Sequence, residues 1–101
     1  MTYNVDFPTE KIKKIFKQNL LKIPNTKLQN KIMDEVEQLA INPRPDGKSK
    51  WKYLKPPISV FNFTASHRIR IENYRVLYDI DESNKTVWIY RLRKRNERTY
   101  K

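Results

Sequence analysis

Apolar residues recur at two different spacings along the chain, and the change from one to the other falls near Gly47. Before this point, apolar positions three and four residues apart predict two helices, over residues 10–22 and 26–40. The predicted core-facing positions are Ile12, Ile15, Phe16 and Leu20 in the first helix, and Leu28, Ile32, Val36, Leu39 and Ala40 in the second. A short connection between two such helices predicts a helical hairpin.

Residues that favour helix ends lie at the expected places. Thr9 precedes the first helix and is expected to cap it. Thr26 and Gln29 have the form of a capping box, which predicts that Thr26 caps the second helix. The second helix is expected to stop at residues 42–47, where two prolines and the only glycine predict a loop.

The remaining segments alternate apolar and polar residues, as strands do. Residues 3–7 form one short run of this kind, and residues 51–54 form another before the two prolines at 56–57 interrupt it. Residues 58–63 fit either a strand or an ordered loop. Three further runs, separated by short polar turns, are rich in β-branched and aromatic residues and cover residues 67–72, 74–80 and 86–93.

This order of elements predicts an α+β fold with an N-terminal strand, a helical hairpin and an antiparallel meander of three to four strands. The helices are expected to cover one face of the sheet. A length of 101 residues fits a single domain over residues 1–101.

Composition restricts the chemistry that the chain can perform. It has no cysteine, one glycine and one histidine, which excludes thiolate chemistry, a glycine-rich phosphate loop and a histidine-rich metal site. We therefore expect no metal and no cofactor. The sequence contains no apolar run of the roughly 20 residues that span a membrane and no signal-peptide pattern, which predicts a cytoplasmic protein.

The net charge of +11 indicates a polyanionic partner such as nucleic acid or an acidic protein. Arginines cluster after residue 50, where their planar guanidinium groups suit bidentate contact with phosphate. Arg68 and Arg70 alternate with Ile69 and Ile71, which predicts a strand with a buried isoleucine face and an arginine face. The arginine face is a candidate surface for an anion, although a solvated face would show the same pattern.

Three motifs and the order of elements resemble the RelE/ParE superfamily of bacterial and archaeal toxins. The motifs are N-P-R-P at 42–45, H-R-I-R-I-E-N-Y-R-V-L-Y-D-I at 67–80, and R-L-R-K-R-N-E-R-T-Y-K at 91–101. The basic residues and the terminal tyrosine look like the RelE branch, whose members cut messenger RNA in the ribosomal A site. The resemblance implies a toxin of a type II toxin–antitoxin module, with a cognate acidic antitoxin, the ribosome with its rRNA, and mRNA as partners.

The resemblance also implies functional residues. The positions that match the catalytic pattern of the RelE branch are Arg68, Arg70, Arg75, Arg95 and Tyr100, and those expected to bind RNA are Lys52, Arg93, Lys94 and Arg98. Two departures matter. Some members carry lysines, which can transfer protons, where Arg68 and Arg70 stand, and arginine is almost never deprotonated. The tail also has one residue more than the common ending Arg-x-Glu-x-Tyr, so the roles of Arg95 and Tyr100 require that the tail absorb an insertion.

Two other functions remain open: a ParE-like inhibitor of DNA gyrase on the same fold, and a basic RNA-binding module without catalysis. Several residues also have simpler structural explanations. His67 is expected on the isoleucine side and in a structural role, and Arg75 could pair with Asp79 or Glu72. The lysines of the first helix (Lys11, Lys13, Lys14 and Lys17) fit a hydrated face or a docking surface for ribosomal RNA. Trp51, Trp88 and Tyr90 are expected in the core or on a sheet face.

Overall fold

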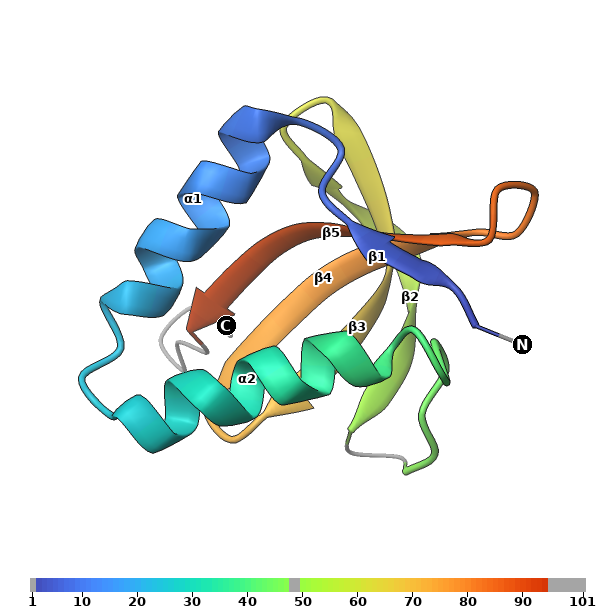
Figure 1. The fold of residues 1–101 in the computed structure, drawn as a ribbon. Coiled ribbons are helices and arrows are strands. Elements are labelled where there is room, and N and C mark those ends of the chain that lie inside the picture. The colour runs from blue at the N-terminus through green and yellow to red at the C-terminus, as the bar shows by residue number, and fades with distance from the viewer. Residues whose placement is uncertain (1, 48–49, 95–101) are drawn as a thin grey trace.

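The computed structural model describes residues 2–47 and 50–94 and shows one sheet with two helices on one face (Figure 1). The elements are β1 (Asn4–Asp6), α1 (Glu10–Leu21), α2 (Thr26–Gln38), β2 (Trp51–Val60), β3 (Phe63–Ile71), β4 (Tyr74–Asp81) and β5 (Thr86–Lys94). The strands lie in the order β1-β5-β4-β3-β2. Strands β2 to β5 form an antiparallel meander, and β1 pairs in parallel with β5. The predicted α+β fold is confirmed, and the meander has four strands.

The two helices begin at capping residues, one of which differs from the prediction. The hydroxyl of Thr9 accepts a hydrogen bond from the backbone N–H of Ile12, as expected for the cap of α1. In α2, however, the cap is Asn25, whose side-chain oxygen accepts from the N–H of Leu28 at 3.1 Å. The capping box predicted for Thr26 is wrong by one residue, because asparagine in extended backbone serves at least as well as threonine.

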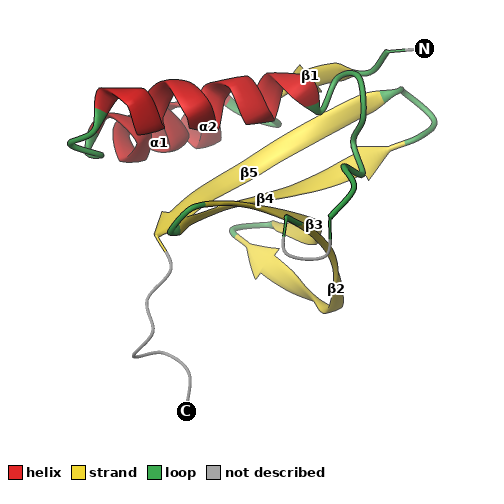
Figure 2. Ribbon diagram, turned by 90° about the horizontal axis from the view of Figure 1, so that it is seen from below, coloured by secondary structure: helices red, strands yellow, loops and turns green. Residues whose placement is uncertain are grey.

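The main core lies between the two helices and the sheet, two layers that Figure 2 shows from a second direction. Both helices turn their apolar stripes toward the same sheet face, where every second residue of the central strands is buried. The buried residues of this core include Phe16, Ile32, Val36, Leu39, Ile69, Ile71, Val76, Tyr78, Val87 and Ile89. Neither helix in the described part of the chain is long and apolar enough to cross a membrane.

Strand β2 runs through the two prolines that were expected to interrupt it. Its pairing with β3 is regular at residues 51–53, shifts register, and resumes at Ile58. Prolines are tolerated here because β2 is the edge strand of the sheet, so only one of its sides has to supply ladder hydrogen bonds. The uncertain segment 58–63 is therefore the end of β2, a turn, and the start of β3.

A second, smaller core lies on the sheet face that points away from the helices. It contains Leu54, Val60, Leu77 and Tyr90. Leu77 lies directly opposite Arg68 on β3, so this cluster shares its side of the sheet with the arginines. Figure 2 shows that β2 and β3 curl away from the helices. Strand β2 contributes Leu54 and Val60 to the second core, and β3 contributes Ala65.

Candidate functional site

Basic residues occupy two adjacent rows across the sheet, on the face opposite the helices. In the first row Lys52, Arg68, Leu77 and Arg91 lie side by side on β2, β3, β4 and β5. In the second row Arg70, Arg75 and Arg93 lie side by side on β3, β4 and β5. Six of these seven positions are lysine or arginine. We call Lys52, Arg68, Arg70, Arg75, Arg91 and Arg93 the arginine face.

The second row places like charges next to each other. Residues directly opposite on antiparallel strands have Cβ atoms about 5 Å apart, and like charges there destabilise a sheet. Arg70 and Arg75 are both half-buried, and their Nε atoms are buried without a hydrogen-bond partner among the described residues. Buried donors of this kind are rare in folded proteins. The arrangement fits a surface that receives acceptor atoms from an anionic ligand.

Arg68 and Arg75 differ from the simplest expectations for this face. Arg68 is only 8% exposed, although an arginine on a solvated face would be open to water. It is covered because its neighbour Leu77 belongs to the second core. Arg75 forms no ion pair within the described part of the chain, and Glu72 instead lies 3.4 Å from the amine of Lys31.

The structure brings together most of the predicted site residues that it describes. Arg68, Arg70, Arg75, Arg93 and Lys52 lie on one face, whereas Lys94 lies opposite Tyr74 and on the helix side of the sheet. Arg95, Arg98 and Tyr100 lie outside the described residues. Sequence reasoning missed Arg91, although its alternation with Arg93 along one strand carried the same signal as Arg68 and Arg70.

His67 lies on the isoleucine side, as expected. Its ring stacks against Trp51 and Tyr78, with centroid distances of 5.8 and 5.4 Å, and only 5% of the residue is exposed. Burial, with a smaller effect of the Arg44 charge, lowers its pKa from 6.5 to about 4, and Glu82 opposes the shift. His67 is therefore neutral near pH 7, and because it faces away from the arginine face it is not positioned to act as a base there.

Asp79 is an acidic residue on the same side of β4 as Leu77, two positions further along. Burial raises the pKa of its carboxyl above the ordinary value, while a backbone hydrogen bond from Ile80 opposes the shift. Nearby Tyr90 is buried, and burial together with the charge of Asp79 raises its pKa to about 12. Tyr90 therefore keeps its proton at neutral pH. Tyr90 belongs to the second core, and the half-buried Trp88 packs against it. Both placements agree with the packing role predicted for these residues.

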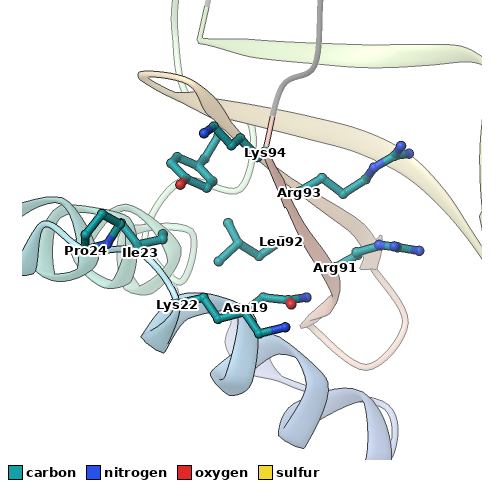
Figure 3. Close-up of a pocket in the computed structure, with 9 residues that line it drawn as sticks. Asn19, Lys22, Ile23, Pro24, Arg91, Leu92, Arg93 and Lys94 are labelled. Atoms are coloured by element: carbon teal, nitrogen blue, oxygen red, sulfur yellow. The ribbon is translucent and has the colours of Figure 1, made fainter. Parts of the chain in front are cut away.

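A cavity of about 490 Å³ lies where the end of β5 meets the connection between α1 and α2 (Figure 3). Leu92 points into it toward Ile23 and Pro24, while Arg91 and Arg93 project in the opposite direction. Arg91 and Arg93 are nevertheless among its lining residues, together with Leu92 and Lys94 of the same strand, so the cavity borders the arginine face. The lysines of α1 form a separate surface, where exposed Lys11, Lys14 and Lys17 and half-buried Lys13 line a shallow hollow.

The described residues contain no group of three or more histidine, cysteine, aspartate or glutamate side chains that could hold a metal ion. The arginine face offers the chemistry of fixed positive charge. Guanidinium groups held by paired strands can bind phosphate oxygens and stabilise negative charge that develops on them.

Three solved structures resemble this one over nearly the whole chain. The archaeal RelE–RelB complex from Pyrococcus horikoshii OT3 contains a chain that is 21% identical, with a TM-score of 0.67 and coverage of 96% of this chain and 99% of that one. The toxin–antitoxin complex RelBE2 from Mycobacterium tuberculosis gives 23% identity, a TM-score of 0.59 and coverage of 94% and 100%. A double arginine-to-alanine mutant of E. coli toxin RelE in the free state gives 13% identity, a TM-score of 0.50 and coverage of 98% of this chain and 88% of that one. At identities this low, the structural likeness shows a shared fold alone.

Family membership comes from the sequence. A comparison with curated proteins found no match. A family model described as the ParE toxin of the type II toxin–antitoxin system parDE matches residues 10–99. The resemblance to the RelE/ParE superfamily is thereby confirmed. Since the match spans nearly all of the chain and the fold is that of the RelE structures, the chain belongs to the ParE toxin family and is a toxin of a type II toxin–antitoxin module.

Proposed function

We propose that this toxin is a RelE-type endoribonuclease, which binds mRNA in the ribosomal A site and cleaves it without a metal. The two rows of the arginine face carry the proposal. They concentrate six cations on one face, where the buried Nε–H groups of Arg70 and Arg75 have no hydrogen-bond partner among the described residues, which is a suitable environment for a scissile phosphate.

The reaction needs both charge stabilisation and proton transfer. The 2′-oxygen of a ribose attacks the adjacent phosphorus, and the bond from phosphorus to the 5′-oxygen breaks. A base removes the 2′-hydroxyl proton, and an acid supplies a proton to the leaving 5′-oxygen. The products are a 2′,3′-cyclic phosphate and a 5′-hydroxyl. Arg68, Arg70 and Arg75 contact the phosphate oxygens and stabilise the charge of the transition state.

The proton-transfer groups are not among the arginines, because a guanidinium keeps its proton at any physiological pH. His67 faces the other side of the sheet. The proposal therefore assigns proton transfer, or stacking on a base of the RNA, to Tyr100, and a further phosphate contact to Arg95. Arg93 and Lys52 bind neighbouring phosphates on the same face, Lys94 binds RNA outside it, and a further RNA contact is assigned to Arg98. A cognate acidic antitoxin would neutralise the same positive surface.

A second candidate function is inhibition of DNA gyrase, which the name of the matching family favours. On this alternative the arginine face would contact an acidic protein surface. The cross-strand packing of Arg70, Arg75 and Arg93 supports the ribonuclease instead, because closely spaced guanidinium groups match the spacing of oxygens on one phosphate better than scattered carboxylates.

One experiment separates the two functions. Purified protein is added to ribosomes translating a defined mRNA, and new 5′ ends are mapped by primer extension, while a parallel reaction measures supercoiling by gyrase. We expect cuts inside translated codons and unchanged supercoiling. Arg75→Ala should lower the cleavage rate by about 10²- to 10³-fold, the usual effect of removing one preorganised charge stabiliser.

Lys31→Ala is the matched control, because Lys31 is an exposed cation on α2 and outside the arginine face. It should cleave at the wild-type rate. Both variants are compared by thermal melting, and Arg75→Ala should be no less stable than wild type, because it removes a like-charge contact. Inhibited supercoiling with intact mRNA would overturn the proposal in favour of gyrase. Neither effect would point to a basic RNA-binding module without catalysis.

A further inference from the structure

A second cavity, of about 450 Å³, opens beside the first residues of β2. Its volume lies in the range of about 300–1,000 Å³ that is typical of small-ligand sites. Loop residues form one wall and the strand forms the other. The lining residues are Arg44, Pro45, Asp46 and Gly47 from the loop, and Trp51, Lys52 and Tyr53 from β2.

The loop wall is held at both ends. At its start, the hydroxyl of buried Tyr78 donates a 2.6 Å hydrogen bond to the carbonyl of Pro43. At its end, the carbonyl of Gly47 accepts from the N–H groups of Lys50 and Trp51. Between these points Arg44 contacts the carboxylate of Glu82 at 3.0 Å. The cavity is therefore a feature of the folded chain, with walls fixed by the sheet.

Tyr53 offers an aromatic surface at the cavity. It is 47% exposed, and its ring meets the ring of His67 edge-on at a centroid distance of 5.4 Å. This contact with the buried histidine holds the tyrosine ring in place. Trp51 stacks on the same histidine and forms the adjacent wall. Exposed aromatic rings next to cations are the surfaces on which unpaired RNA bases stack.

Lys52 connects this cavity to the arginine face. It lines the cavity, and it also lies directly opposite Arg68 in the first row. Its side chain is exposed and forms no ion pair with any described residue. A strand of RNA whose phosphates follow the arginine face would reach the edge of the sheet at Lys52, where the next base could turn into the cavity.

We propose that the cavity between the 44–47 loop and β2 binds one unpaired base of the RNA, stacked on Tyr53, next to the phosphates held by the arginine face. This inference rests on the proposed function. It makes the cavity a subsite for sequence preference, with the Asp46 carboxylate as the acceptor for a base N–H and Arg44 as the donor for a base oxygen.

Binding of short single-stranded oligoribonucleotides tests the subsite. The oligomers are 2′-O-methylated to block cleavage, carry a fluorescent label, and have one base at a time replaced by an abasic site. Fluorescence anisotropy measures each affinity. In wild type, one abasic position should weaken binding by about 5- to 150-fold, the effect of losing one stacked base. Tyr53→Ala should weaken binding of the intact oligomer by a similar factor and then tolerate that abasic position. Tyr53→Phe should behave as wild type.

Two controls keep the result specific. Phe61→Ala removes another aromatic side chain, 52% exposed at the turn between β2 and β3, and should leave every affinity unchanged. Arg75→Ala should weaken all oligomers alike and keep the abasic pattern. If Tyr53→Ala and the abasic site each weakened binding independently, so that the two factors multiplied, the subsite would be overturned and the proposed function would stand. Failure of wild type to bind any oligomer would likewise overturn the subsite, whereas the proposed function is decided by the cleavage assay on translating ribosomes. Full affinity in Arg75→Ala would overturn the role of the arginine face in holding the phosphates.

Discussion

Single residues in this protein take their roles from which sheet face they occupy. His67 and Arg68 are neighbours in sequence and both are buried, yet they face opposite sides of β3. The sequence predicted this separation, because alternation along a strand is a local property. It did not predict that Arg68 would be covered, because Leu77 and the second core come from distant strands. Nor did it identify the exposed ring of Tyr53 beside a cavity.

Stability should depend on pH through His67. Its pKa in the folded chain lies below the ordinary 6.5, at about 4, mainly because the ring is buried. Between these two pH values the unfolded chain binds more protons than the folded chain. The free energy of unfolding therefore falls as the pH is lowered from about 6.5 to about 4. The fall amounts to about 1.4 kcal/mol for each unit by which the pKa of His67 differs between the folded and unfolded chain.

The matched variant is His67→Phe, which keeps an aromatic ring between Trp51 and Tyr78. Urea unfolding of both proteins at several pH values gives the difference between them. Wild type should lose stability relative to His67→Phe as the solution becomes more acidic within this window. If the difference in free energy of unfolding between the two proteins stayed constant from about pH 6.5 to about pH 4, His67 would have the same pKa in the folded and the unfolded chain.

At the scale of elements, local sequence signals located every helix and strand but not every boundary. Each helix has a side-chain cap, and the second cap is Asn25 instead of Thr26. Asn25 directly precedes Thr26 and has extended backbone, so its side chain reaches the N–H of Leu28. The prolines of β2 also misled the prediction, because their tolerance depends on the edge position of the strand.

The position of the cap makes a direct prediction. Asn25→Ala should lower the free energy of unfolding by about 0.5–2 kcal/mol, because the N–H of Leu28 loses its acceptor. Thr26→Ala should change it by less than about 0.5 kcal/mol, since this exposed residue is already within the helix. Thermal or urea unfolding measures both. The reverse order of effects would restore Thr26 as the cap.

For the molecule as a whole, positive charge is concentrated by folding. Strands β3, β4 and β5 each contribute arginines that are far apart in sequence, and the sheet sets them in two rows. The helices cover the opposite face, so no described helix lies over the arginine face (Figure 2). The overall charge of +11 predicted a polyanion as partner, and this topology gives that charge a definite surface.

Salt should therefore weaken RNA binding steeply. If all six cations of the arginine face contact phosphates, the logarithm of the binding constant should fall against the logarithm of salt concentration with a slope of about −4 for single-stranded RNA. Arg75→Ala should make the slope shallower by about 0.7, and Lys31→Ala should leave it unchanged. Anisotropy titrations over a range of salt concentrations measure it. Equal slopes for wild type and Arg75→Ala would show that Arg75 does not contact an RNA phosphate.

The sequence by itself determined the order of the elements, their amphipathic faces and the basic character of the partner surface. These properties follow from spacing within a few residues and from composition, so they need no knowledge of distant contacts. Only the tertiary structure decided that Arg91 lies in one row with Lys52 and Arg68, and that the 44–47 loop forms a cavity with β2. Strand register, the bulge in the β4–β5 pairing at Tyr90 and the curl of β2 and β3 set these positions. They depend on residues from separate strands packing together, which spacing along one strand does not encode.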